Sequence, residues 1–305
     1  MSTDPYHEGE RQVQELTGER ASAILNGRAI ASRIPGAGRA FIARQQLAVV
    51  ATRSAQADLW ATMITGQEGF ASASEDLQFL DVQIRDEGSV LKRLPLGDAL
   101  QVSCPIGTLF IDLATRRRLR VNGSISSVNN DTLRIAVQEA FPNCPKYIQR
   151  RSIRCHGAPS SSSAPESGTA LTPEIESWIQ RADTAFVASS HPDGRLDASH
   201  RGGKPGFVLI RDGALRIPDY PGNSLFNTLG NLALNPKAGL TLVDFENARQ
   251  LQLTGDVVFD FGIADEQELT AGTMRWWIFR PRRWIASPWN TPTNWAFVDA
   301  SPFNP

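Results

Sequence analysis

Short apolar runs separated by glycine-containing turns dominate the hydrophobic pattern of this chain. Strand-forming residues flank Pro192-Asp193-Gly194 and Asp212-Gly213, so each turn predicts a hairpin in which glycine supplies positive φ. Many short strands with few helices favour a small barrel over alternating strand and helix units. The predicted strands are 46–52, 58–65, 69–73, 77–82, 107–113, 118–124, 185–190, 196–200, 207–211, 214–217, 239–244 and 250–259.

One helix is well marked by its first residues. Thr172 is an expected N-cap and Pro173 fits the first helical position. Two further helices are predicted, one within residues 1–30 and one over 223–235, which Pro236 ends. In the marked helix, four apolar residues recur at the spacing of one face: Ile175, Trp178, Ile179 and Ala182.

The same pattern of apolar, Asp and Gly positions occurs twice along the chain. Ile111-Asp112-Leu113 and Gly123 recur 132 positions later as Val243-Asp244-Phe245 and Gly255 (244 − 112 = 255 − 123 = 132), and upstream segments recur at an offset of 137. A repeat this long indicates two copies of one domain, which we expect to pack about a pseudo-twofold axis with sites between the copies. The expected division is an N-terminal repeat over 1–158, a Ser/Pro-rich linker over 159–170 and a C-terminal repeat over 171–305.

Composition limits the classes of function. The 305 residues suffice for two domains, and 31 Lys+Arg against 32 Asp+Glu provide no global field for nucleic acid or an anionic membrane. No apolar run approaches 18 residues, and the polar, acidic N-terminus is not a secretory signal. Three cysteines predict reduced thiols in the cytoplasm. Cys155-His156 has no second Cys/His pair, so no metal site is expected.

The main candidate for chemistry is the polar segment Ser199 to Gly206, which contains His200, Arg201 and Lys204. Glycine backbone and two cations would hold a phosphate, although a solvated hairpin loop is the alternative. The first copy lacks the charges, which favours one functional site. With no dinucleotide or Walker fingerprint, a mononucleotide is the better ligand. The first-copy equivalents are Thr62, Met63, Ile64 and Gln67.

A second candidate segment runs from Asp219 through Asn223 to Thr228. It is either a turn with a helix cap or a helix N-terminus directed at a phosphate. Asp112 and Asp244 are interpreted as turn formers rather than catalytic acids. No residue qualifies as a general acid or base, because neighbouring strand residues such as Ser199 and His200 point to opposite faces.

Five tryptophans cluster near the end of the sequence among arginines. Packing across the pseudo-dimer and stacking beside a flat cofactor ring are both open, whereas binding of single-stranded nucleic acid fits the neutral chain poorly. The five are Trp276, Trp277, Trp284, Trp289 and Trp295.

These residues resemble the pyridoxamine 5′-phosphate oxidase superfamily of FMN-binding split β-barrels, in particular a flavin-nucleotide-binding subgroup. The segment 197–204 resembles the family's phosphate strand, with Lys204 at its closing lysine. The segment 226–236 resembles its Asn-Leu…Asn-Pro helix, and 249–255 its Arg-Gln-Val-Arg-Ile-x-Gly strand, in which Gln250 would meet the flavin. The resemblance implies a mainly β fold with flanking helices, in which two tandem split barrels form an internal pseudo-dimer. It does not favour pyridoxamine phosphate as substrate.

The resemblance further implies FMN, in preference to FAD or haem, and flavin-mediated hydride or electron transfer on a small molecule with a donor such as NAD(P)H. Arg201 and Lys204 would neutralise the phosphate, with Ser199 and Thr228 completing its hydrogen bonds. Arg118, the first-copy equivalent of Gln250, is either a cation near the flavin or part of a solvated turn. The competing class is a non-catalytic flavin or haem carrier with His200 as the haem ligand. Two such chains could also associate as a homodimer of pseudo-dimers, and the sequence leaves this oligomeric state undecided.

Overall fold

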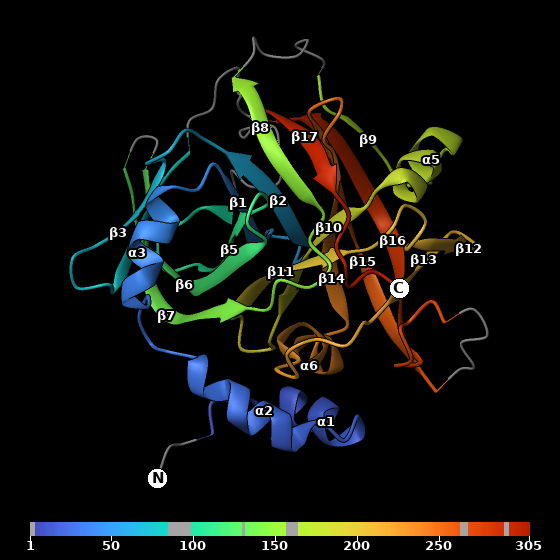
Figure 1. Cartoon of the computed structure of the whole chain (residues 1–305), viewed down its shortest axis with the longest axis horizontal. Coiled ribbons are helices and arrows are strands. Elements are labelled where there is room, and N and C mark those ends of the chain that lie inside the picture. The colour runs from blue at the N-terminus through green and yellow to red at the C-terminus, as the bar shows by residue number, and fades with distance from the viewer. Residues whose placement is uncertain (1–3, 85–98, 130–131, 157–163, 263–267, 290–292) are drawn as a thin grey trace.

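Two antiparallel sheets of the same strand order make up the protein. The computed structural model describes residues 4–84, 99–129, 132–156, 164–262, 268–289 and 293–305. One sheet runs β2-β1-β5-β6-β7-β4-β3 and the other β11-β10-β14-β15-β16-β13-β12, so each strand of the first has a counterpart in the second (Figure 1). The mainly β fold and its tandem arrangement are therefore confirmed.

The first sheet contains β1 (Leu47–Arg53), β2 (Leu59–Thr65), β3 (Ala71–Ala73), β4 (Phe79–Gln83), β5 (Pro105–Asp112), β6 (Arg117–Asn129) and β7 (Thr132–Asn143). The second contains β10 (Thr184–Ser190), β11 (Leu196–Gly202), β12 (Leu209–Arg211), β13 (Ala214–Pro218), β14 (Lys237–Asp244), β15 (Arg249–Phe261) and β16 (Arg275–Pro288). Outside this order are β8 (Arg150–His156), β9 (Glu166–Gly168) and β17 (Thr293–Asp299). The helices are α1 (Glu8–Leu16), α2 (Arg20–Asn26), the 3₁₀ helix η1 (Gly27–Ala29), α3 (Gly36–Ala43), α5 (Pro173–Arg181) and α6 (Asn227–Leu234).

The strand registers repeat residue for residue. Val50 of β1 faces Thr108 of β5, and Val187 of β10 faces Leu240 of β14, at the offsets 137 and 132 found in the sequence. A bulge follows Asn122 in β6, and an equivalent bulge separates Thr254 from Gly255 in β15. The two repeats thus share backbone detail as well as strand order.

Alternating side chains of β1 and β10 serve two different cores. Val50 faces the apolar core of the first barrel, whereas its neighbour Val49 faces a third core that also contains Phe186 of the second repeat. The barrels approach so closely there that a Cβ on Gly107 would lie 2.9 Å from the backbone of Asp197. The equivalent Gly239 has backbone atoms of the first repeat just as near. The repeats therefore form one continuous apolar interface.

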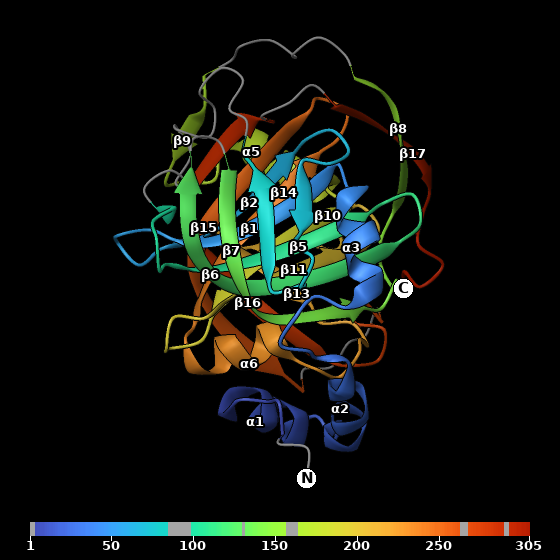
Figure 2. The same cartoon turned by 90° about the vertical axis from the view of Figure 1, so that its left-hand side faces the viewer.

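Two further elements connect the repeats. The strands β8 and β17, although far apart in sequence, pair as a two-stranded ribbon along one side of the molecule, toward the end opposite α1 and α2 (Figures 1 and 2). At the other end α1 lies against α6 of the second repeat, and a Cβ on Gly9 would meet the carbonyl oxygen of Gly230 at 2.2 Å. Glycine at both positions allows this helix crossing.

Most predicted elements occur close to their predicted bounds. Thr172 caps α5, its hydroxyl accepting from the N–H of Ile175 at 3.4 Å. Asp112 and Asp244 each accept backbone N–H groups of their turns, as expected. The pattern did not predict β7, β8, β9, β16 or β17. Residues 159–163 of the predicted linker lie outside the described residues. The strand β9, also within the predicted linker, pairs with β16. The domain bounds therefore remain a proposal. No helix within the described segments is long and apolar enough to span a bilayer.

Candidate functional site

A small cationic pocket of about 60 Å³ lies where the two repeats meet. Three guanidinium groups reach it, and none of the described residues around it is Asp or Glu. Residues of both repeats line it. Its lining comprises Arg118, Arg120, Asn143, Cys144, Tyr147, His200, Arg201, Gly202, Phe207, Pro218, Tyr220, Gly222 and Asn223.

Arg118, on β6 of the first repeat, is held by the loop that follows β7. Its Nε donates to the carbonyl oxygen of Cys144 at 2.8 Å, and its Nη2 lies 3.5 Å from the Cys144 sulfur. Burial lowers the pKa of Arg118 to about 10, so the side chain still carries its charge at neutral pH. The first repeat therefore supplies a fixed cation to a pocket built largely on the second.

Arg201, on β11, has one acidic partner at longer range. Its Nη2 lies 3.7 Å from Oδ1 of the buried Asp219. The other oxygen of Asp219 accepts from Nε of Arg275 at 3.0 Å, and burial raises the pKa of Asp219 against the effect of both arginines. Asp219 thus positions Arg201 without lining the pocket itself.

His200 is a buried imidazole without hydrogen-bond partners among the described residues. Its side chain packs edge-on against Phe186 and is only 3% exposed. Neither Nδ1 nor Nε2 has a partner in the described part of the chain. Burial lowers the pKa of His200 well below 6.5, and the neighbouring Arg118 and Arg201 act in the same direction. The ring is therefore neutral, able to donate one hydrogen bond and accept another.

Two tyrosines cover the pocket from opposite loops. The ring centroids of Tyr147 and Tyr220 lie 4.7 Å apart, and the Tyr147 hydroxyl donates to the carbonyl oxygen of Pro221 at 3.0 Å. Burial raises the pKa of Tyr147 to about 12, so this hydroxyl keeps its proton. Asn223 lies beside them on the loop before α6.

The structure separates the other sequence candidates from this pocket. Ser199 points to the opposite face from His200, as expected for a strand, and its hydroxyl accepts from Thr228 at 2.9 Å. Lys204 is exposed and lines a different groove, beside Trp178 and Phe245. Of the nine candidates, only Arg118, His200, Arg201 and Asn223 line the pocket.

Gln250 lies at the counterpart of the pocket, on the other side of the pseudo-twofold axis. Its side-chain oxygen accepts from the N–H of Met63 at 2.9 Å and its amide donates to the Met63 carbonyl at 3.2 Å. Met63 and Gln250 are the equivalents of His200 and Arg118 (63 + 137 = 200; 118 + 132 = 250). Gln250 therefore does not line the pocket with Arg201, because its amide joins the two repeats at the opposite position.

Three further positions equivalent to the polar residues in and beside the pocket also carry uncharged side chains. Gln252, the equivalent of Arg120, donates to the Thr62 hydroxyl and the Ala61 carbonyl, each at 2.8 Å. Trp60 and Ile64, the equivalents of Asp197 and Arg201, are each 1% exposed. The cationic pocket thus has no charged counterpart among these equivalent positions.

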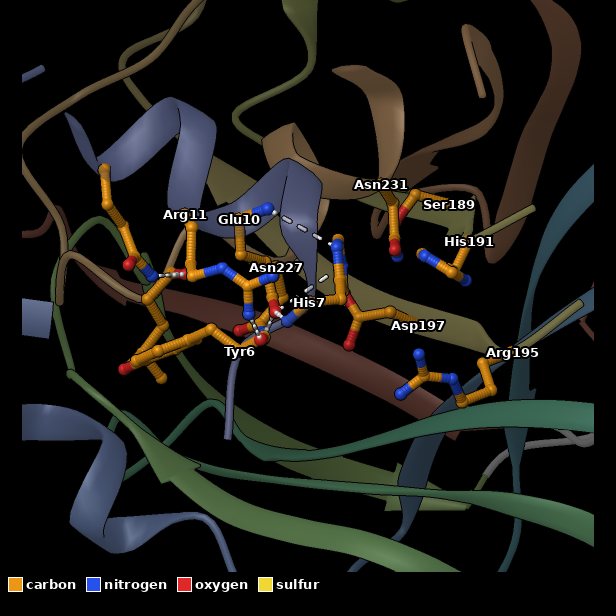
Figure 3. Close-up of polar contacts among 12 residues, drawn as sticks. Tyr6, His7, Glu10, Arg11, Ser189, His191, Arg195, Asp197, Asn227 and Asn231 are labelled. Carbon is orange, nitrogen blue, oxygen red and sulfur yellow. Dashed lines mark hydrogen bonds and ion pairs between the residues drawn. The ribbon is translucent and has the colours of Figure 1, made fainter. Parts of the chain in front are cut away.

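A polar cluster adjoins the pocket through Arg120. One nitrogen of Arg120 lies 3.0 and 3.1 Å from the two oxygens of Asp197 and 3.2 Å from the side-chain oxygen of Asn227. Asn227 in turn donates to Glu10 of α1 (Figure 3). Burial raises the pKa of Glu10 to about 8. Arg120 is thus balanced by a carboxylate, leaving Arg118 and Arg201 as the cations most available to a ligand.

The tryptophans of the C-terminal region serve packing. Trp277 and Trp284 lie in the second-barrel core, and Trp289 and Trp295 in the core between the repeats, where both pack on Phe245. Trp276 is 3% exposed, and none of the five lines the pocket. Stacking beside a cofactor in this pocket is therefore not supported.

Sequence reasoning missed several lining residues. Arg120 lies two positions after Arg118 on the same strand face, so its position could have been inferred from strand alternation. Cys144, Tyr147 and Tyr220 come from loops whose approach depends on packing of the two repeats.

Comparison with known proteins finds a family similarity in the second repeat. The sequence model of pyridoxamine 5′-phosphate oxidase matches residues 171–280. No curated protein matches the chain. Among solved structures, HupZ of Group A Streptococcus is 18% identical, with 36% of this chain and 89% of that one covered and a TM-score of 0.30.

Two other solved structures show likeness of the same extent. The haem storage protein HutZ of Vibrio cholerae is 16% identical over 37% of this chain and 89% of that chain, with a TM-score of 0.27. General stress protein 26 of Bacillus anthracis is 10% identical over 41% of this chain and 96% of that chain, with a TM-score of 0.29. Because these identities and TM-scores are low, the three structures add no argument to the sequence match with residues 171–280.

Proposed function

We propose that this chain, which belongs to the pyridoxamine 5′-phosphate oxidase-like split-barrel superfamily, is an FMN-binding flavoprotein with one phosphate site per chain. The observation that supports this most directly is the cationic pocket between the repeats, with three arginines and no acidic residue among its described lining. A phosphate monoester dianion fits such a set of donors. Oxidoreduction with the bound flavin follows as part of the same proposal.

The residues present fit the phosphate of a mononucleotide. Arg118 and Arg201 would neutralise it, and the unpartnered imidazole of His200 would donate one hydrogen bond. A pocket of about 60 Å³ accommodates a phosphate group but not a flavin ring. Binding of the whole cofactor therefore requires the loops that carry Tyr147 and Tyr220 to move apart, a rearrangement of the kind that a substantial minority of binding events involve.

The bound flavin would supply hydride or electron transfer, with NADH or NADPH as the proposed donor. The chain's own residues would hold the phosphate, position the ring at the repeat interface and limit access of water. Neutral His200 and protonated Tyr147 add no negative charge to the pocket. A reaction that needs an acid or base would take it from the substrate or from water.

The visible spectrum of the purified protein, followed by a calorimetric titration with FMN, tests the proposal. We expect the absorbance of an oxidised flavin, or saturable binding of one FMN per chain after removal of any endogenous cofactor. Anaerobic NADH or NADPH should bleach the flavin, and air should restore it. Absence of FMN binding would overturn the proposal. Reduction by dithionite alone would instead indicate a flavin carrier.

A haem-binding function is the second candidate, because both nitrogens of the neutral His200 imidazole lack partners among the described residues. A neutral imidazole nitrogen is a common haem ligand. A Soret band on addition of haem, abolished in His200→Ala but retained in Arg118→Ala, would favour this function over flavin binding.

A further inference from the structure

The cationic pocket also contains a thiol. Cys144 lies in the loop after β7, is partly exposed, and lines the pocket together with three arginines. Nη2 of Arg118 lies 3.5 Å from its sulfur, while Nε of the same guanidinium donates to its carbonyl oxygen at 2.8 Å. The thiol and a fixed cation are thus held together by two contacts.

A second, independent observation indicates that a ligand enters beside this thiol. His200 is only 3% exposed, lines the same pocket, and has no hydrogen-bond partner for either ring nitrogen within the described part of the chain. Buried polar groups are normally satisfied, so an unpartnered imidazole indicates a hydrogen bond that a ligand supplies. An anionic group that accepts this bond would also lie close to Arg118 and Arg201.

We propose that Cys144 is a modification site for small anionic thiol-reactive compounds, in particular disulfides that carry carboxylates. Reactive cysteines occur in electropositive, partly exposed surroundings, which is the environment found here. A carboxylate in the pocket would bring the disulfide to the sulfur of Cys144, much as the cations would bring a phosphate.

The proposed step is thiol–disulfide exchange. The Cys144 sulfur loses its proton to solvent and attacks one sulfur of the disulfide, forming a mixed disulfide as the original S–S bond breaks. The other half leaves as a thiolate and takes up a proton. Cys144 is oxidised, the released half is reduced, and no other oxidant is needed. The step does not require a flavin, so it can hold even if FMN does not bind.

Paired alkylation with iodoacetate and iodoacetamide tests this proposal, because the two reagents differ mainly in charge. Trypsin cleaves after Arg134 and Lys146, so Cys144 lies in a different peptide from Cys104 and Cys155. Cys104, which packs against the first-barrel core, is the internal control. We expect the ratio of iodoacetate to iodoacetamide rates at Cys144 to exceed that at Cys104 by about tenfold, the effect of one charge-assisted contact.

Three further measurements connect the preference to the pocket. Inorganic phosphate should slow alkylation of Cys144 but not of Cys104. Arg118→Ala and Arg201→Ala should each reduce the iodoacetate preference, whereas the exposed Arg44→Ala should not. Oxidised glutathione should add one glutathione to the Cys144 peptide, reversibly with dithiothreitol.

The proposal is overturned if Cys144 shows the same reagent ratio as Cys104, if phosphate gives no protection, or if glutathione adds elsewhere. The reagent ratio, phosphate protection and glutathione addition are all measured on the unaltered protein, so they decide the question even if an arginine variant fails to fold.

Discussion

The two positions that the pseudo-twofold axis relates have nearly the same backbone and opposite chemistry. At one, Arg118 of β6 approaches His200 and Arg201 of β11 and leaves a charged pocket. At the other, Gln250 of β15 bonds to the backbone of Met63 on β2, and the equivalent side chains are uncharged. The comparison teaches that side chains on two strands, rather than the fold, determine which interface position is positively charged.

The largest difference between the two positions should be in stability. Trp60, the equivalent of Asp197, is buried in the first-barrel core. Trp60→Ala should lower the free energy of unfolding by about 3–5 kcal/mol, because it leaves a large cavity. Urea denaturation followed by circular dichroism measures this. FMN affinity of the folded fraction should be unchanged, and a loss of affinity there would show that the two positions are coupled.

Substitution of Arg118 and of its equivalent Gln250 should affect different properties, FMN affinity in the first case and stability in the second. Arg118→Ala should weaken FMN binding by roughly 10- to 150-fold, corresponding to about 1.5–3 kcal/mol for a charge-assisted contact. Gln250→Ala should leave FMN affinity unchanged and lower the free energy of unfolding, since the N–H and carbonyl of Met63 lose their buried partner. Calorimetric titration of both variants provides the test. Equal affinities in the two variants would contradict the assignment of the pocket.

The helix α1 packs against α6 of the second repeat, and its buried Glu10 should make stability depend on pH. Burial raises the pKa of Glu10 from 4.5 to about 8. Between these values the unfolded chain has released the proton that the folded chain keeps. Stability should therefore fall as pH rises from about 4.5 to 8, by at most about 1.4 kcal/mol per pH unit.

Urea denaturation of the wild type and of Glu10→Gln across this range isolates the effect of Glu10. The variant should have the flatter profile, because its side chain does not titrate. Parallel profiles would show that Glu10 ionises normally in the folded protein.

The smallest expected effect concerns the first helix of each repeat. Thr172 caps α5, whereas the equivalent Pro35 before α3 provides no side-chain cap (35 + 137 = 172). Thr172→Ala should cost about 1 kcal/mol in unfolding free energy. Thermal denaturation of the variant, compared with Thr17→Ala at the C-cap of α1, measures this loss. No loss at position 172 would mean that the 3.4 Å contact contributes nothing.

The repeat was predictable because it depends on local features that survive duplication, namely the turn-forming Asp112 and Asp244 and the glycines at interface and bulge positions. The strand β16 was not predicted, because its tryptophans and arginines resemble a binding segment as much as a strand. The ribbon of β8 and β17 was hidden for another reason: its partners, such as Arg151 and Phe297, are distant in sequence and lack an alternating pattern.

For the site, Arg201, His200 and Arg118 were predictable from the contrast between the copies, because loss of charge in one copy is visible in the sequence. The separation of Gln250 from these residues was not predictable, because the strand motif 249–255 that contains Gln250 lies in the same repeat as Arg201. Only the crossing of the repeats determines that β6 of the first repeat, and not β15, faces β11. Pockets between repeats require a three-dimensional arrangement that local sequence does not specify.

The ribbon of β8 and β17 joins the segment between the repeats to the strand that follows the second one. In an ordinary homodimer, an interface site is lost when dilution separates the subunits. Here both halves of the pocket belong to one covalent chain, so their encounter is intramolecular and independent of protein concentration. Each repeat can also acquire a substitution that the other repeat lacks, which is impossible when one gene encodes two identical subunits. A single asymmetric pocket is the outcome that such freedom allows.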